Sequence, residues 1–332
     1  MKRTFRALAA ALGIACLATQ AYAQAPDARM TAFDAHASTP LPTRFDLPAP
    51  GGGQNTVLLL EKLQSDIDFD GQAASIFLAE IDGRPGTIVR TGDSLDIALD
   101  DDIDAGDGTG RPPLPGRVDG EQANDLLTVP PQEQLARRAG GEETGAADEL
   151  HVWIFLHDDA GESNRGAFLN RYVSWWIRDM EQAVRVGVPV RVTLRSAVPG
   201  ITDMDYHAGS VVDRLRDLRA SGRTYVRAQG GRITSLTKFM LFVAKPPANL
   251  EGGTVGAAIE PFGASVASSQ GHRHVVAHEL GHLLGATHED AENRFFCITN
   301  MKDSLWGAIP CRYYSGTNDE NIRRYIRART GS

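Results

Sequence analysis

The chain has 332 residues, of which 42% are hydrophobic and 23% are charged, and its formal net charge at pH 7 is -8. This composition is typical of a globular protein, and it excludes a disordered or fibrous chain. The negative charge argues against nucleic acid and anionic membranes as partners. The length allows one large domain and one smaller domain.

Residues 1–23 have the pattern of a signal peptide. Three basic residues precede an apolar run, and Ala21 and Ala23 frame a site for signal peptidase. We therefore expect cleavage after Ala23 and a secreted or periplasmic protein. The apolar run is too short to anchor the chain across a bilayer. A lipid anchor on Cys16 is an alternative, but the residues before it fit a lipobox poorly.

Residues 24–148 are expected to form an acidic, β-rich unit followed by a linker. Short alternating runs separated by Gly-Asp turns predict strands between residues 56 and 99. An acidic run follows, and its simplest interpretation is a solvated surface. An EF-hand is excluded because Pro113 stands where a loop starting at Asp102 needs its closing glutamate. Whether calcium binds elsewhere is left open.

Residues 149–332 are expected to form an α/β domain. Apolar runs predict strands at 151–157, 188–197 and 237–244 and two short strands within 252–269, while helical spacing predicts helices at 166–185 and 208–222. Gly222 is expected to end the second helix, and Trp175 and Trp176 are expected in the core. Strands that alternate with helices indicate a mostly parallel sheet covered on both faces.

Only two cysteines remain after removal of the signal peptide, Cys297 and Cys311. An even number of cysteines in an exported chain predicts one disulfide. Two buried free thiols are the alternative. A zinc site is disfavoured because two isolated thiolates do not complete a zinc coordination sphere.

Five of the nine histidines lie in the segment 272–290. His274, His278 and His282 share one face of a predicted helix. Eight helical residues rise about 12 Å, whereas zinc holds each nitrogen at about 2 Å. A single ion can therefore bind only two neighbouring histidines of the three.

The neighbouring residues select His278 and His282 as the pair of metal ligands. Glu279 supplies a carboxylate beside them, where it can act as a general base without being a ligand. Gly285 can take the left-handed conformation that ends a helix, which would turn His288 back as the third ligand. Three neutral imidazoles leave an open position for water, which is typical of catalytic zinc.

The other histidines receive no role in this interpretation. His272 and His274 are expected to face solvent or to make local hydrogen bonds. Glu289 and Asp290 are candidates for orienting an imidazole, although acidic residues are common beyond a helix end. No function is assigned to His151, His157 and His207.

The stretch HELGHLLGATHE, residues 278–289, resembles the extended zinc signature of the metzincin metallopeptidases. The order of predicted elements between 150 and 290 is similar to the adamalysin-like (reprolysin) branch. The signal, the acidic unit and the compact size look closest to the secreted peptidyl-Asp metallopeptidases. The resemblance covers about residues 150–315.

The resemblance implies a metzincin-like catalytic domain over residues 149–332. Its sheet would have five strands, mostly parallel, with an antiparallel edge strand, an active-site helix and a small C-terminal subdomain. Met301 would form the methionine turn beneath one zinc ion, inside a loop closed by the disulfide. The substrate would lie along the edge strand at 252–260. A monomeric zinc endopeptidase acting on proteins or peptides is therefore expected.

The same resemblance makes residues 24–148 a pro-segment of a zymogen. A cysteine switch is excluded because no cysteine lies between the signal peptide and Cys297. A carboxylate from the acidic run is a candidate cap for the metal. If cleavage occurs next to acidic residues, Lys302 and Arg312 are the candidate cations of the specificity pocket.

Two other classes compete with this interpretation. The chain could be an exported zinc-binding toxin or docking module whose N-terminal unit binds a partner. Glu279 argues against a site that only binds, because binding needs no general base. A gluzincin would use Glu320 as its last ligand, but it leaves Gly285 and His288 unexplained.

Overall fold

The computed structural model describes most of the chain between residues 28 and 330. The described residues are 28–100, 126–127, 147–161, 164–248, 250, 254–295, 297–302 and 311–330. The predicted signal peptide, the end of the acidic run and most of the predicted linker lie outside them. Within the described residues, no helix combines the length and apolar character needed to cross a membrane.

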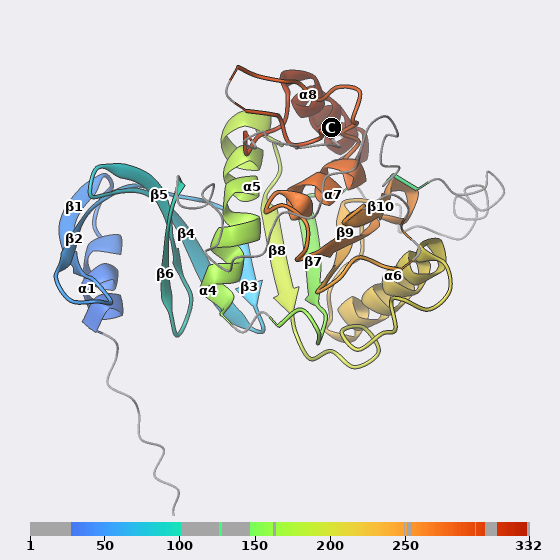
Figure 1. Cartoon of the computed structure of the whole chain (residues 1–332), viewed down its shortest axis with the longest axis horizontal. Coiled ribbons are helices and arrows are strands. Elements are labelled where there is room, and N and C mark those ends of the chain that lie inside the picture. The colour runs from blue at the N-terminus through green and yellow to red at the C-terminus, as the bar shows by residue number, and fades with distance from the viewer. Residues whose placement is uncertain are drawn as a thin grey trace, which may run out of the picture.

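The C-terminal part is built on strands that lie side by side in the order β8-β7-β9-β11-β10 (Figure 1). Their bounds are β7 Leu150–Leu156, β8 Val190–Arg195, β9 Thr237–Val243, β10 Gly256–Ile259 and β11 Ala264–Ser268. The first four of that order pair in parallel, and β10 pairs antiparallel to β11. The prediction of a mixed α/β fold is confirmed.

The sheet is larger than the expected five strands, so that prediction is wrong. Among the described residues it has eleven strands, because the N-terminal strand β3 pairs in parallel with β8 and extends the sheet. The N-terminal elements are α1 Ala28–Ala37, β1 Thr43–Pro48, β2 Gln54–Lys62, β3 Asp66–Phe69, β4 Gln72–Ile81, β5 Arg84–Arg90 and β6 Leu95–Leu99. The N-terminal strands and the C-terminal strands therefore belong to one hydrogen-bonded sheet.

Helices cover both faces of the C-terminal part of this sheet (Figure 1). One face carries α5 Ser174–Asp179, α7 Val275–Leu283 and α8 Gly316–Thr330, and we call it the α7 face. The other carries α6 Val211–Ala228, and we call it the α6 face. Alternate residues of β9 enter the two cores: Met240 packs on the α7 face and Leu241 on the α6 face.

Two predicted helices differ from the observed ones. The helix expected at 166–185 is divided into α4 Arg165–Phe168, a π-helical turn Leu169–Val173, α5 and a second π-helical turn Met180–Val184. The other helix, α6, does not end at Gly222, so that prediction is wrong. Gly222 is a buried interior residue, and a Cβ there would lie 2.8 Å from the ring of Phe239. This glycine permits close packing of α6 on β9.

Candidate metal centre

Helix α7 carries His278 and His282 one turn apart on its buried side. The helix ends in a Schellman motif: the Ala286 amide donates to Gly281 O at 2.9 Å and the Gly285 amide to His282 O at 3.2 Å. Gly285 has φ of 85°, which confirms the predicted left-handed conformation. The chain thereby turns back and brings His288 to the two helical histidines.

The three imidazoles converge through their Nε2 atoms. Nε2 of His288 lies 3.1 Å from Nε2 of both His278 and His282. All three ligand atoms lie within 4.8 Å of one another, so this group could hold a metal ion. Tetrahedral ligands at zinc distances are about 3.3 Å apart. The donor set therefore fits zinc in both chemistry and spacing.

Backbone carbonyls orient the two helical imidazoles. Nδ1 of His278 lies 2.9 Å from the carbonyl oxygen of Asn300, and Nδ1 of His282 lies 3.3 Å from that of Ala286. A carbonyl only accepts, so each Nδ1 carries the proton and each Nε2 keeps a lone pair for a metal. Such outer contacts fix ring orientation at metal sites.

The carboxylate of Glu279 lies against strand β10. The side chain is 1% exposed, and a Cβ added at Gly256 would lie 2.3 Å from Oε1 of Glu279. Only a glycine at position 256 leaves room for the carboxylate in this position. Gly256 was not predicted from the sequence, although an isolated glycine inside a short apolar strand is a known sign of close approach.

Met301 lies directly beneath α7. It is fully buried, and its Sδ lies 2.5 Å from the Cβ that a side chain at Gly281 would have. Tyr314 also packs against α7, and its hydroxyl donates to the carbonyl of Ala277 at 2.6 Å. Trp176 in turn donates from Nε1 to the Tyr314 oxygen at 3.2 Å. Neither Gly281 nor Tyr314 stands out in the sequence, because their partners are distant along the chain.

The predicted disulfide between Cys297 and Cys311 is confirmed, with Cα atoms 4.9 Å apart. It closes the loop that contains Asn300 and Met301.

Arg312, a candidate cation for acidic substrates, donates to Oδ1 of Asp100 at 3.0 Å and also to the Asp100 carbonyl. Its guanidinium is therefore engaged by the N-terminal unit.

The expectation that His274 faces solvent or makes local hydrogen bonds is wrong. Its side chain is 7% exposed and its Nδ1 has no hydrogen-bond partner. Burial lowers the pKa of His274 well below its usual value, so the ring is neutral. It does not belong to the metal-binding group, as the helical rise predicts. His272 is exposed, as expected.

Other candidate residues lie outside the histidine group. Glu320, the last ligand of the gluzincin alternative, pairs instead with Arg323 at 3.0 Å on α8. The carboxylate of Asp290 accepts from Asn321 at 2.7 Å and thereby ties the loop to α8. Within the described part of the chain, no other group of three potential ligands is present.

The outer edge of strand β10 contacts another segment of the same chain. Leu126 forms an isolated parallel bridge with Ala258, and the Leu127 amide donates to Ala258 O at 2.8 Å. This short green segment lies beside β10 in Figure 1. The edge strand expected to receive a substrate is therefore in contact with two residues of the predicted linker.

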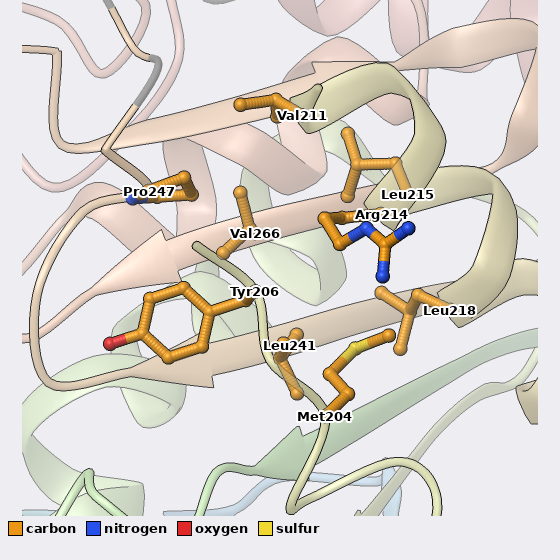
Figure 2. A pocket seen from close by; sticks show the side chains of 9 residues that line it. All are labelled: Met204, Tyr206, Val211, Arg214, Leu215, Leu218, Leu241, Pro247 and Val266. Carbon is orange, nitrogen blue, oxygen red and sulfur yellow. The ribbon is translucent and has the colours of Figure 1, made fainter. Parts of the chain in front are cut away.

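A small pocket lies on the α6 face, away from the histidines (Figure 2). Its lining residues are Met204, Tyr206, Val211, Arg214, Leu215, Leu218, Leu241, Pro247 and Val266. Ligand sites usually contain several convergent polar groups. This pocket is lined mostly by apolar side chains, so it does not compete with the histidine group as the candidate site.

A comparison with protein-family models and with curated proteins finds no match to this chain. The histidine geometry is therefore the main guide to function.

Proposed function

We propose that this chain is an exported zinc endopeptidase of the metzincin type, monomeric and active on proteins or peptides. The observation that carries the proposal is the combination of three converging imidazoles with an adjacent carboxylate. Nε2 of His288 lies 3.1 Å from both other Nε2 atoms, and Glu279, next to His278 in the chain, packs against Gly256. A site that only binds metal needs no such carboxylate.

In the proposed reaction, His278, His282 and His288 would hold the ion. Zinc bound there would act as a Lewis acid and lower the pKa of water, so that hydroxide would be available to attack a carbonyl near neutral pH. Glu279 would accept the proton of the attacking water and pass it to the leaving amine. The adjacent strand β10 would hold the peptide backbone in an extended conformation.

A preference for cleavage next to acidic residues of the substrate is a separate proposal. Arg312 is already paired with Asp100, so a substrate carboxylate would have to displace that contact. Lys302 lies next to Met301, and its amide donates to Thr299 O at 3.1 Å. Comparing Lys302→Gln with wild type on a peptide library would show whether preference for acidic residues depends on this charge.

The decisive experiment measures zinc content and peptide-library cleavage for wild type and Glu279→Ala. We expect the variant to retain zinc and to lose cleavage. Glu61→Ala is a matched control, because Glu61 is an exposed glutamate of β2, outside the histidine segment. Cleavage that survives Glu279→Ala would contradict the role of Glu279 as the general base. A wild type that binds zinc but cleaves no peptide would contradict the proposal and favour a binding module.

A further inference from the structure

The N-terminal unit adds a strand directly to the sheet that carries the metal centre. Strand β3 pairs with β8 from Asp66↔Arg191 to Phe69↔Leu194. The pairing continues past the strand end, where Ser196 donates from its amide and its hydroxyl to the two carboxylate oxygens of Asp70, at 2.8 and 2.6 Å. Strand β3 also pairs with β4 on its other edge, so it is an interior strand of the sheet.

The two parts also share one hydrophobic core. Side chains of the N-terminal unit in the α7-face core include Leu63, Ile67, Phe69, Ile76, Leu78 and Val89. They belong to the same cluster as Trp176 and Val276, and the ring of Phe69 meets that of Phe168 edge-on at 6.3 Å. Removal of the N-terminal unit would expose a contiguous apolar surface, which monomeric proteins rarely tolerate.

A carboxylate from the C-terminal part is satisfied by the N-terminal unit. Glu181 accepts from the amides of Gln64 and Ser65 at 2.9 and 2.7 Å, and from the Ser65 hydroxyl at 2.5 Å. Separation of the parts would leave all three donors and this carboxylate without these partners. Such a contact is costly to break.

A further contact leads from the N-terminal unit to the metal centre. Asp100 accepts from Arg312, which directly follows Cys311 at the end of the disulfide loop and precedes Tyr313. The carbonyl of Tyr313 accepts from the Asn300 amide at 2.9 Å, and the carbonyl of Asn300 accepts from Nδ1 of His278. Arg178 of α5 adds a second cation 3.6 Å from the Asp100 carboxylate.

We infer that residues 28–100 are a permanent part of the fold that carries the metal centre, and that Asp100 is a positioning residue acting on His278 through the disulfide loop. This differs from the pro-segment expected from the sequence, which would have to leave before the site works. The role of Asp100 rests on the proposed metal centre but not on peptide hydrolysis.

Cleavage of the linker in the full mature chain tests the first part. A site for a specific protease is inserted between residues 127 and 147, and the cut protein is analysed by size-exclusion chromatography and zinc analysis, with the uncut insertion variant as control. We expect the two pieces to elute together and to keep their zinc. Separation of the pieces under native conditions would overturn the inference.

Asp100→Asn tests the second part by zinc affinity, measured by competition with a chelator and by the absorption spectrum of the cobalt(II) form. Loss of an outer contact typically weakens metal binding about 10- to 100-fold. We expect weakening in this range, partial recovery in Asp100→Glu and a change of less than about twofold in the matched Asp93→Asn, whose partner is Arg165.

Unchanged zinc affinity and an unchanged cobalt spectrum in Asp100→Asn would overturn the positioning role. None of these readouts uses a peptide, so a chain that binds zinc but cleaves nothing would contradict the proposed peptidase and leave this inference standing. If wild type binds no zinc, the metal centre and the role of Asp100 are both wrong. Linker cleavage would still decide whether residues 28–100 are permanent.

Discussion

The two faces of the sheet differ in what they bury. On the α7 face, His278, Glu279 and His282 are all buried, and the imidazoles of His278 and His282 converge with that of His288. On the α6 face, the small pocket is lined by apolar side chains and by Arg214, which pairs with Asp217 at 2.9 Å (Figure 2). Converging buried polar groups therefore indicate a functional site more reliably than a surface pocket does.

Glycines on the two faces show the same difference. Gly256 makes room for the carboxylate of Glu279, whereas Gly222 makes room for the ring of Phe239. Both positions exclude a side chain, one beside the proposed general base and one within an apolar core. The same substitution to alanine should therefore affect catalysis at one position and stability at the other.

The largest effect is expected for Gly256→Ala. The new methyl would lie 2.3 Å from Oε1 of Glu279 and would displace the carboxylate. Misplacement of a catalytic group by about 1 Å costs about 100-fold in rate. We expect kcat to fall by this factor with zinc content unchanged. Gly316→Ala is the control, because its added methyl meets nothing within 4 Å. An unchanged kcat would contradict the assigned role of Gly256.

Gly222→Ala should lower stability and leave catalysis intact. The methyl would lie 2.8 Å from the ring of Phe239. Overpacking of this kind costs about 1–3 kcal/mol, which lowers the midpoint of thermal unfolding by about 2–10 °C. Calorimetry measures the shift, and kcat/KM per folded molecule should equal that of wild type. A loss of kcat/KM without a loss of stability would break the distinction between the two faces.

Asp179→Asn should flatten the pH dependence of stability. Burial, as the largest cause, raises the pKa of Asp179 to about 8 from 3.8. The folded chain therefore holds a proton that the unfolded chain releases, so this residue costs stability as pH rises from about 4 to about 8. We expect the midpoint of thermal unfolding of the metal-free variant to fall less than that of wild type between pH 6 and 8.5, by a few degrees. Parallel curves for the two proteins would contradict this.

The smallest effect is expected at the edge of β10. Leu127→Pro removes the amide that donates to Ala258 O. Loss of one hydrogen bond corresponds to about two- to tenfold in an equilibrium constant. If peptides use this edge, KM should fall by that factor with kcat unchanged, while Leu127→Val keeps the amide and should match wild type. An unchanged KM in the proline variant would place the substrate elsewhere.

The local part of the metal site could be predicted from the sequence. The spacing of His278, His282 and Gly285 along one helix and its end determines most of the geometry. The residues that were missed act over long separations: Gly256 and Asn300 lie 23 residues before and 22 residues after the side chains that they contact. No local pattern marks such partners.

The size of the sheet escaped prediction for a related reason. The segment Asp66–Phe69 alternates acidic and apolar residues, which indicates a half-exposed strand. Its parallel partner β8 lies more than a hundred residues later, and periodicity does not encode which strands pair. Gly222 was misinterpreted because a glycine that admits Phe239 and a glycine that ends a helix look alike in sequence.

The three histidines lie within a single short segment, from residue 278 to residue 288. Bringing them together closes only a small loop, and the entropy lost in that closure grows slowly with loop length. An ion can therefore bind this segment before the distant strands pair, and binding to the unfolded chain reduces the net stabilisation that an ion gives the native state. We expect the metal to matter more for the order of events in folding than for the final equilibrium.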